Sequence, residues 1–165
     1  MVLVTGVAEG LGASIAKTFA AAGYDVLGLA RSDKASSHLA RVVGEGDGVY
    51  RHLTCDVTQP AEMAEVLRPH LDRIGVLVHN AHALLIKPFA ATASGEFEQA
   101  WRVACFGAFV ASHIVLPAMV ARGAGTVIFT GATAGLRGGA DFAAFASAKF
   151  ALRGLAQSLA REFGP

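Results

Sequence analysis

Short apolar runs rich in β-branched residues alternate along the chain with longer stretches in which apolar residues recur every three or four positions. Strands are predicted at Val2–Thr5, Asp25–Ala30, Val49–Leu53, Val76–His79 and Thr126–Thr130. Helices are predicted at Leu11–Ala22, near Ser36–Val43, at Pro60–Leu71, from about Phe97 to Ala121 and from about Asp141 to Phe163. Strands that alternate with helices are typical of βαβ units, so the pattern predicts an α/β fold around a parallel sheet. In the first helix we expect Leu11, Ile15 and Phe19 to share one face.

Composition and charge narrow the function classes. The 165 residues fit a single domain, residues 1–165, and 53% apolar against 16% charged residues predicts a folded core. Fourteen Lys and Arg against thirteen Asp and Glu give a net charge of +1 with no block of like charges, so we expect no nucleic-acid or membrane partner. The expected partner is a small-molecule substrate. Cys55 and Cys105 lie in no metal-ligand spacing and fit the reducing cytoplasm, so no metal is expected.

One segment, Val103–Ala121, lacks charged residues and is long enough to cross a bilayer. His113, Ser112 and Pro117 interrupt it. Soluble helices packed on two sides also appear continuously apolar, and this is the interpretation we prefer.

A glycine-rich turn joins the first predicted strand to the first helix. Glycines allow a tight turn and let backbone N–H groups approach a pyrophosphate, whose charge is favoured at a helix N-terminus. An ordinary glycine-rich turn is the alternative. We expect cofactor contacts from Thr5, Gly6, Gly10, Leu11 and Gly12.

The chain resembles the short-chain dehydrogenase/reductase family over its whole length. The motifs that carry the resemblance are Gly6-x-x-x-Gly10-x-Gly12, Asp56-Val57, Asn80-Ala81 and Lys149. The resemblance implies a Rossmann-type, doubly wound parallel sheet of strand order 3-2-1-4-5. It also implies a dinucleotide lying across the carboxyl ends of the strands, at the switch point between the first and fourth.

The resemblance also implies roles for single residues. Asp56 would hold the adenine amino group and Val57 would line the adenine, although a turn or helix cap also explains Asp56. Asn80 and Ala81 would border the adenosine ribose. Lys149 would face the nicotinamide ribose.

The end of the second strand bears on the choice between NADP and NAD. Arg31 and Ser32 stand where an acid would accept hydrogen bonds from a ribose 2′-hydroxyl, and their side chains suit a 2′-phosphate. Glu9 argues for NAD, because NADP-binding members often carry a basic residue in the glycine loop. We expect NADP with NAD as the alternative; Arg31 as a merely solvated charge is also open.

Three of the family's four catalytic positions carry other residues. Phe145 stands at the Tyr position, Ala132 at the Ser position and Ala104 at the Asn position, and Lys149 matches. This indicates a divergent branch with Phe in place of the catalytic Tyr. Phenylalanine has no proton to give, and Asp141, His82 and Thr133 are candidate replacement acids.

Three functions remain open at this point. The first is an NAD(P)-binding oxidoreductase with weak or altered hydride transfer on a carbonyl or alcohol. The second is a non-catalytic dinucleotide-binding sensor or partner subunit, and the third is a structural chain that has lost its ligand. The glycine turn argues against the third.

We also expect a homodimer or homotetramer built on the last two helices, with monomer core as the alternative reading of their apolar faces. The small residues that we expect to admit a second backbone are Ala104, Gly107, Ala108 and Ala111 in one helix and Ala144, Ala148, Ala151 and Gly154 in the other. The last helix does not return the chain to the sheet. We therefore expect a truncated or partly ordered form of a longer chain, or a helix that docks on a partner.

Overall fold

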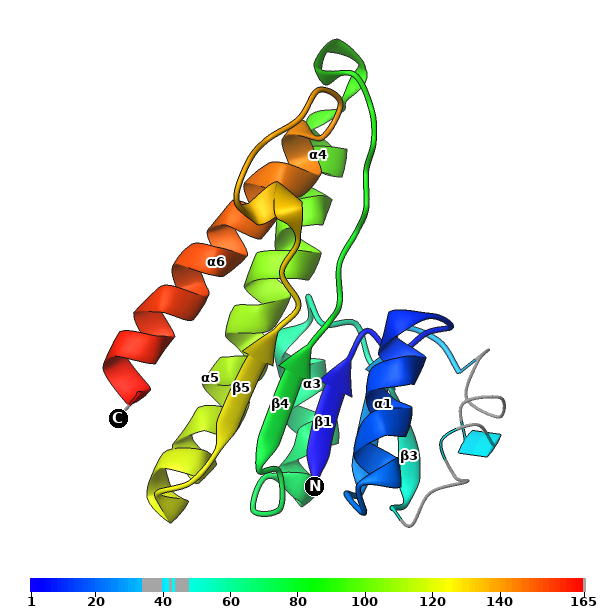
Figure 1. The fold of residues 1–165 in the computed structure, drawn as a ribbon, viewed down its shortest axis with the longest axis vertical. Helices are drawn as coiled ribbons and strands as arrows, with labels where there is room; N and C mark the ends of the chain where they lie inside the picture. The colour runs from blue at the N-terminus through cyan, green and yellow to red at the C-terminus, as the bar shows by residue number, and fades with distance from the viewer. Residues whose placement is uncertain (34–39, 42, 44–47, 165) are drawn as a thin grey trace.

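A twisted parallel sheet forms the centre of the molecule (Figure 1). The computed structural model describes residues 1–33, 40, 41, 43 and 48–164; most of the helix predicted near Ser36–Val43 lies outside them. Within the described residues the strands are β1 (Val2–Thr5), β2 (Val26–Ala30), β3 (Tyr50–Thr54), β4 (Val76–His79) and β5 (Thr126–Phe129). Their order, β3-β2-β1-β4-β5, and the Rossmann-type α/β class are as predicted.

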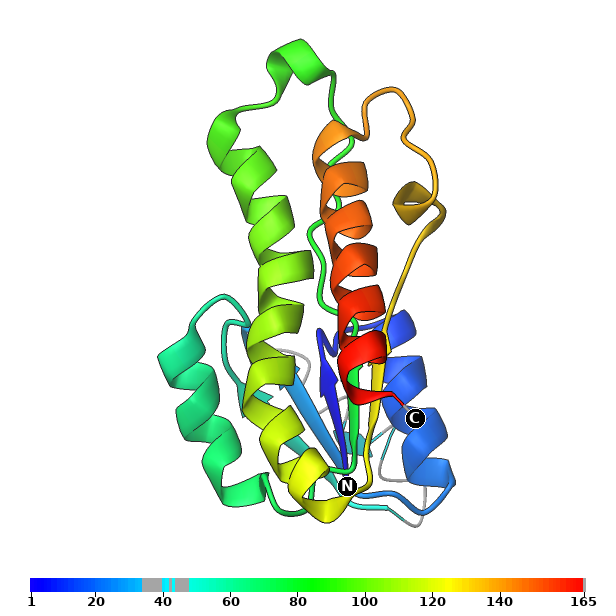
Figure 2. The ribbon, with the colours of Figure 1, turned by 90° about the vertical axis from the view of Figure 1, so that its left-hand side faces the viewer.

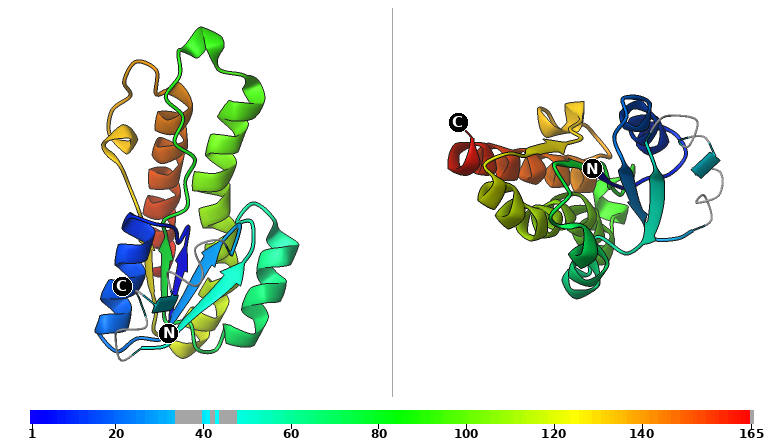
Figure 3. Two further views of the ribbon diagram at one scale, coloured as in Figure 1. Left: turned by 90° about the vertical axis from the view of Figure 1, so that its right-hand side faces the viewer. Right: turned by 90° about the horizontal axis from the view of Figure 1, so that it is seen from below.

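Helices cover both faces of this sheet (Figure 3). They are α1 (Leu11–Ala21), α3 (Pro60–Leu67), α4 (Ser94–Trp101), α5 (Gly107–Arg122) and α6 (Ala143–Phe163). One face packs against α1, and the other against α3 and α5. The predicted helix to Leu71 ends earlier as an α-helix and continues as a 3₁₀ turn, Arg68–His70, because Pro69 lacks the N–H of an α-helical bond.

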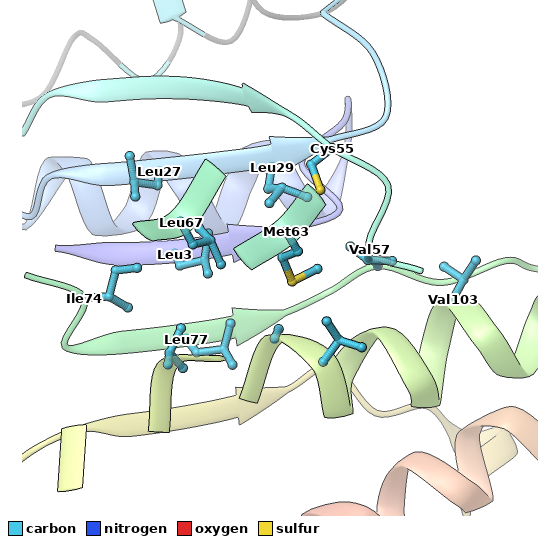
Figure 4. Packing of buried hydrophobic residues seen from close by; sticks show 14 of the residues in the cluster. Leu3, Leu27, Leu29, Cys55, Val57, Met63, Leu67, Ile74, Leu77 and Val103 are labelled. Carbon is cyan, nitrogen blue, oxygen red and sulfur yellow. The ribbon is translucent and has the colours of Figure 1, made fainter. Parts of the chain in front are cut away.

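The strands send alternate side chains into two apolar layers. Val2 and Val4 pack toward α1, whereas Leu3 packs with Met63 and Leu67 of α3. Figure 4 shows the second layer, in which α3 lies over the leucines of three neighbouring strands. Burial on both faces explains why these strands are continuously apolar in sequence.

Small residues form the buried stripe of α1. Leu11, Ile15 and Phe19 share one face of the helix, as the spacing predicts. The buried positions Gly12, Ala16 and Ala20 lie one residue further along, while Leu11 is 56% exposed. Small side chains let the helix lie close to the sheet, and Ile15 and Phe19 pack at the side of the contact.

α4 and α5 form one continuous helix through a π-helical segment, Arg102–Phe106. It begins before the predicted Phe97, where a Glu96 carboxylate oxygen accepts the N–H of Ala93 at 2.9 Å. By length and composition alone, Ser94–Arg122 would be able to span a membrane, and 56% of its most apolar window is buried inside the protein.

α6 runs alongside this long helix (Figure 2). Ala144 and Ala148 pack against Ala100 and Ala104, and all four side chains are buried. Gly107, Ala108 and Ala111 are buried as well. The predicted small residues among these therefore form close contacts within this chain, whereas Ala151 is half-buried and Gly154 is exposed, and the expected assembly on the two helices stays a prediction.

Candidate functional site

A pocket of about 370 Å³ opens at the carboxyl ends of the strands. The predicted site residues that line it are Gly6, Arg31, Ser32, Asp56, Val57, Asn80 and Ala81. In Figure 4, Cys55 and Val57 lie near the ends of the strands, and Val103, also in the lining, lies on the long helix beyond them. A larger groove of about 850 Å³ lies elsewhere, between β5 and the C-terminal parts of α5 and α6, and holds none of the predicted site residues. The strand-end pocket is therefore the candidate site.

The glycine turn forms one wall of the pocket and leads into α1. Gly6 and Gly10 have φ of 73° and 98°, values that residues with a Cβ rarely adopt. A Cβ on Gly6 would lie 2.6 Å from the backbone of Ala81, and one on Gly12 would strike the Gly6 carbonyl oxygen. Gly12 is thus required by the fold of the turn itself.

Thr5, the last residue of β1 before the glycine turn, forms a buried hydrogen bond with His79. Both side chains are fully buried, and Thr5 Oγ1 lies 2.8 Å from His79 Nδ1. His79 Nε2 donates to the Val103 carbonyl at 3.3 Å, so in the neutral ring Nδ1 accepts from the threonine hydroxyl. Burial lowers the pKa of His79 to about 4. Thr5 is occupied by this bond and does not line the pocket.

Asn80 presents an unpaired acceptor at the pocket wall. Its Nδ2 donates to the Gly6 carbonyl at 3.0 Å, while its buried Oδ1 has no hydrogen-bond partner within the described part of the chain. A buried amide oxygen without a donor is unfavourable. A bound molecule with a hydroxyl or amino group would satisfy it.

Asp56 forms a turn with Thr58 and also lines the pocket. One carboxylate oxygen, Oδ1, accepts from the backbone N–H and the hydroxyl of Thr58, both at 2.8 Å. The alternative prediction for Asp56, a role in a turn, is therefore confirmed for that oxygen. The residue still lines the pocket beside Val57, whose side chain lies against Gly107 of α5.

Lys149 and Phe145 lie deeper, outside the pocket lining. Both are buried in α6, and the Lys149 ammonium donates to the Thr130 carbonyl at 2.7 Å and lies 5.7 Å from the centre of the Phe145 ring. Burial lowers the pKa of Lys149. The half-buried Ala132 precedes the 3₁₀ turn Thr133–Gly135, and Ala104 lies in the π-helical segment.

The sequence profile described as short chain dehydrogenase matches residues 1–165. The chain belongs to this family. It is 28% identical over 170 residues to "Uncharacterized oxidoreductase YciK" of Escherichia coli, covering 99% of this chain and 68% of that protein. It is 32% identical over 164 residues to 3-oxoacyl-[acyl-carrier-protein] reductase FabG of Salmonella typhimurium, covering 97% of this chain and 66% of that protein.

Solved structures agree with this assignment. A short-chain dehydrogenase from Rhodopseudomonas palustris superposes with a TM-score of 0.87 at 39% identity, covering 98% of this chain and 77% of that one. A metagenomic short-chain oxidoreductase in complex with NADP superposes with a TM-score of 0.91 at 27% identity, covering 99% and 76%. The chain spans about two thirds of the length of the curated relatives it matches.

Of the candidate acids, His82 lies against the short-chain dehydrogenase family's tyrosine position. Its ring centre is 6.1 Å from that of Phe145, it lines the pocket, and its Nδ1 donates to the Asn80 carbonyl at 3.1 Å. The Asp141 carbonyl accepts the N–H of Lys87 at 2.8 Å, and Thr133 begins a 3₁₀ turn.

Sequence reasoning missed several residues at the site. It assigned no role to His79, whose ring bridges β1 and the π-helical segment. It also missed Gln99 and Val103, which reach the pocket from the long helix. A polar residue within an otherwise apolar strand was the one available signal for His79.

Proposed function

We propose that this chain forms the dinucleotide-binding part of an NADP-dependent oxidoreductase with weak or altered hydride transfer on a carbonyl or alcohol. The observation that carries the proposal is one pocket lined by the glycine turn, Asn80, and the Arg31-Ser32 pair. When bound, the reduced nicotinamide supplies a hydride to a carbonyl carbon, and the carbonyl oxygen takes a proton to give the alcohol.

The residues that line the pocket are suited to binding a dinucleotide. The unpaired Asn80 Oδ1 would accept a hydrogen bond from a ribose hydroxyl. Gly6 lies so close to Ala81 that no side chain fits at position 6 of the turn. Arg31 and Ser32 are exposed at the pocket, where a guanidinium and a hydroxyl suit a phosphate. The NADP complex of a relative in the same family is consistent with this preference.

The replacements at three of the family's four catalytic positions support a slow reaction. Phe145 offers no proton, and loss of a positioned acid typically lowers a rate by ~10²–10⁴. Lys149, bonded to the Thr130 carbonyl, holds its charge beside the phenylalanine ring. His82 is the imidazole nearest to that position in the pocket, and its Nε2 is the atom left to transfer a proton.

A non-catalytic sensor or partner subunit is the second candidate. The buried, unreactive Phe145 ring favours it, because the pocket requires no catalysis to bind a dinucleotide.

Calorimetric titration with NADP⁺ and NAD⁺ tests the binding proposal. We expect NADP⁺ to bind more tightly; absence of binding by either would remove the proposal. Loss of nicotinamide absorbance with a panel of ketones and aldehydes then separates the two candidates. Slow turnover supports the oxidoreductase, and tight binding with no turnover supports the sensor.

We further propose that the protein is a cytoplasmic homodimer or homotetramer that contacts neither nucleic acid nor membrane. The free cysteines and the net charge of +1 support the location and the partners. The assembly is supported by exposed aromatic side chains on the two long helices: Phe97, Trp101, Phe109 and Phe150.

A further inference from the structure

A chain of hydrogen bonds joins β3 to the segment that follows β2. Tyr50 Oη lies 3.0 Å from His52 Nδ1 on the same strand, and His52 Nε2 lies 3.0 Å from the Ser32 carbonyl oxygen. Tyr50 and His52 are two residues apart on a strand, so their side chains share a face of the sheet. The tyrosine, the histidine and Ser32 thus form one linear network.

The chemistry of the partners fixes the direction of each bond. A carbonyl oxygen only accepts, so His52 Nε2 donates to Ser32. In the neutral ring Nδ1 is then an acceptor, and the Tyr50 hydroxyl donates to it. Burial raises the pKa of Tyr50 to about 12, which keeps that donor protonated.

The neighbouring strand leaves space for this network. Gly28 pairs with His52 in the sheet register, and a Cβ on Gly28 would strike the Tyr50 hydroxyl and lie 2.6 Å from its Cε2. The tyrosine ring therefore lies across the glycine and packs against the α1 layer. The ring is held by packing, so its hydroxyl is a fixed anchor for His52.

The network ends at the pocket. The β2–β3 ladder stops at the pair Ala30 and Thr54, and the next two residues of the chain, Arg31 and Ser32, line the pocket. Among the hydrogen bonds between described residues, the one from His52 is the bond that secures Ser32. A backbone held at Ser32 restricts the positions open to the Arg31 and Ser32 side chains.

We propose that His52 is a positioning residue for the 2′-phosphate subsite, holding the Ser32 backbone through a bond anchored by Tyr50. This inference rests on the proposed binding of NADP at Arg31 and Ser32. It assigns to His52 a part in discrimination between the two dinucleotides and no contact with the reacting atoms.

The test is a calorimetric titration of wild type and variants with NADP⁺ and NAD⁺, and with the fragments 2′,5′-ADP and 5′-ADP. His52→Phe keeps a ring but removes both hydrogen bonds, and loss of one such bond corresponds to a roughly fivefold change in affinity. We expect His52→Phe to weaken NADP⁺ and 2′,5′-ADP roughly five- to tenfold, with NAD⁺ and 5′-ADP within about twofold of wild type.

Further variants distinguish the loss of the positioning bond from a general loss of structure. His52→Gln keeps a donor near Nε2 and should recover most of the NADP⁺ affinity, while Tyr50→Phe should give a smaller loss in the same direction. His70→Phe, in the 3₁₀ turn Arg68–His70, is the matched control and should change neither affinity. If His52→Phe does not fold, Tyr50→Phe and His52→Gln carry the comparison.

The outcomes are distinguishable. Equal loss of both dinucleotides, or unchanged NADP⁺ binding in His52→Phe, overturns the inference while leaving the proposed function intact. Wild type that binds neither dinucleotide, or binds NAD⁺ alone, overturns the proposed NADP site and this inference with it. A selective loss for the phosphate-bearing ligands supports both.

Discussion

At the scale of single residues, His79 shows how an uncharged imidazole serves as a buried connector. It accepts from Thr5 of β1 and donates to Val103 of the long helix, so it ties the start of the glycine turn to the helix beside the pocket. Protonation would place the ring's second N–H at Nδ1 and reverse the bond to Thr5, whose hydroxyl would then have to accept. Burial disfavours the charged ring, which is why the pKa of His79 is lowered.

Stability should fall in acid because of this residue. Burial lowers the pKa of His79 to about 4 from the ordinary 6.5, so between these values the unfolded chain binds the extra proton. The contribution to the free energy of unfolding is complete above pH 6.5 and falls as pH drops, by roughly 3 kcal/mol once pH is below about 4. His79→Asn, which keeps a donor and an acceptor, should flatten that part of the curve.

Urea unfolding of wild type and His79→Asn at pH 7, 6 and 5 measures the difference, with His70→Asn as control. The groups that two compared proteins share contribute equally and cancel in the comparison. Parallel pH dependences for wild type and His79→Asn would contradict the assignment.

Arg31 should decide between the two dinucleotides. Arg31→Ala removes a charge-assisted bond to the 2′-phosphate, so we expect NADP⁺ affinity to fall roughly 10- to 100-fold and NAD⁺ affinity to stay within about twofold. Calorimetry measures both. Arg153→Ala, an exposed arginine on α6, should leave both affinities unchanged; a fall in NADP⁺ affinity no larger than that for NAD⁺ would show that Arg31 does not contact the phosphate.

Phe145→Tyr alone should not restore a fast reductase. The new phenol would share a helix face with Lys149, but Ala132 would still provide no hydroxyl to the carbonyl. We expect turnover of a simple ketone to stay well below the ordinary enzyme rate, on the order of 10 per second. The double variant Phe145→Tyr/Ala132→Ser should exceed the single one, and a single variant that reaches the ordinary rate would refute the prediction.

At the scale of elements, small residues form the buried face of α1 and the contact between α6 and the long helix, whereas α3 buries the larger Met63 and Leu67. Gly12, Ala16 and Ala20 of α1 lie on the sheet, and Ala144 and Ala148 of α6 meet Ala100 and Ala104. Larger residues such as Leu11 and Phe109 are left partly exposed. Close backbone approach, more than side-chain size, determines which helix face is buried here.

A larger side chain at such a contact should destabilise the fold. Ala148→Leu places extra methyl groups where the α6 alanines already meet those of the long helix, and overpacking costs ~1–3 kcal/mol. Ser147→Leu, exposed on the same helix, should change the free energy of unfolding by less than about 0.5 kcal/mol. Urea unfolding compares them; equal values would mean that the alanine contact has room to relax.

At the scale of the whole molecule, the long helix carries a stacked aromatic row on its surface. Trp101, Phe106, Phe109 and His113 stack in sequence with ring centres 6.2, 6.3 and 5.5 Å apart. Phe109 is 47% exposed. Trp101 and Phe109 of this row belong to the exposed aromatic surface that supports the proposed assembly.

Light scattering at micromolar concentration should therefore find a dimer or tetramer. Phe109→Asp places a charge in the row and should shift the mass toward the monomer, while Leu136→Asp, 64% exposed on the loop after β5, should not. A monodisperse wild-type monomer would remove the assembly proposal.

Most of the fold was predictable because it depends on periodicity that is local in sequence. The strand bounds differ from the predicted ones by one residue at most. The central strands β1, β2 and β4 are buried on both faces and mostly apolar, whereas β3 and β5 are only partly buried. Among site residues, Arg31 was found because it follows the second strand, and Asp56 and Asn80 were found through the resemblance to the family. All three line the pocket, because parallel strands bring their carboxyl ends to one edge.

From the sequence alone the alternation of strands and helices was predictable, because repeated apolar patterns encode it, and the resemblance to the family supplied the sheet order and most of the residues at the strand ends. Which helix faces are buried, the bond between Thr5 and His79 and the bond between His52 and Ser32 became evident in the tertiary structure. These contacts join residues far apart in the chain, and their bonds depend on distances and on which atom donates. The pattern of apolar and polar residues along the chain does not encode these distances or bond directions.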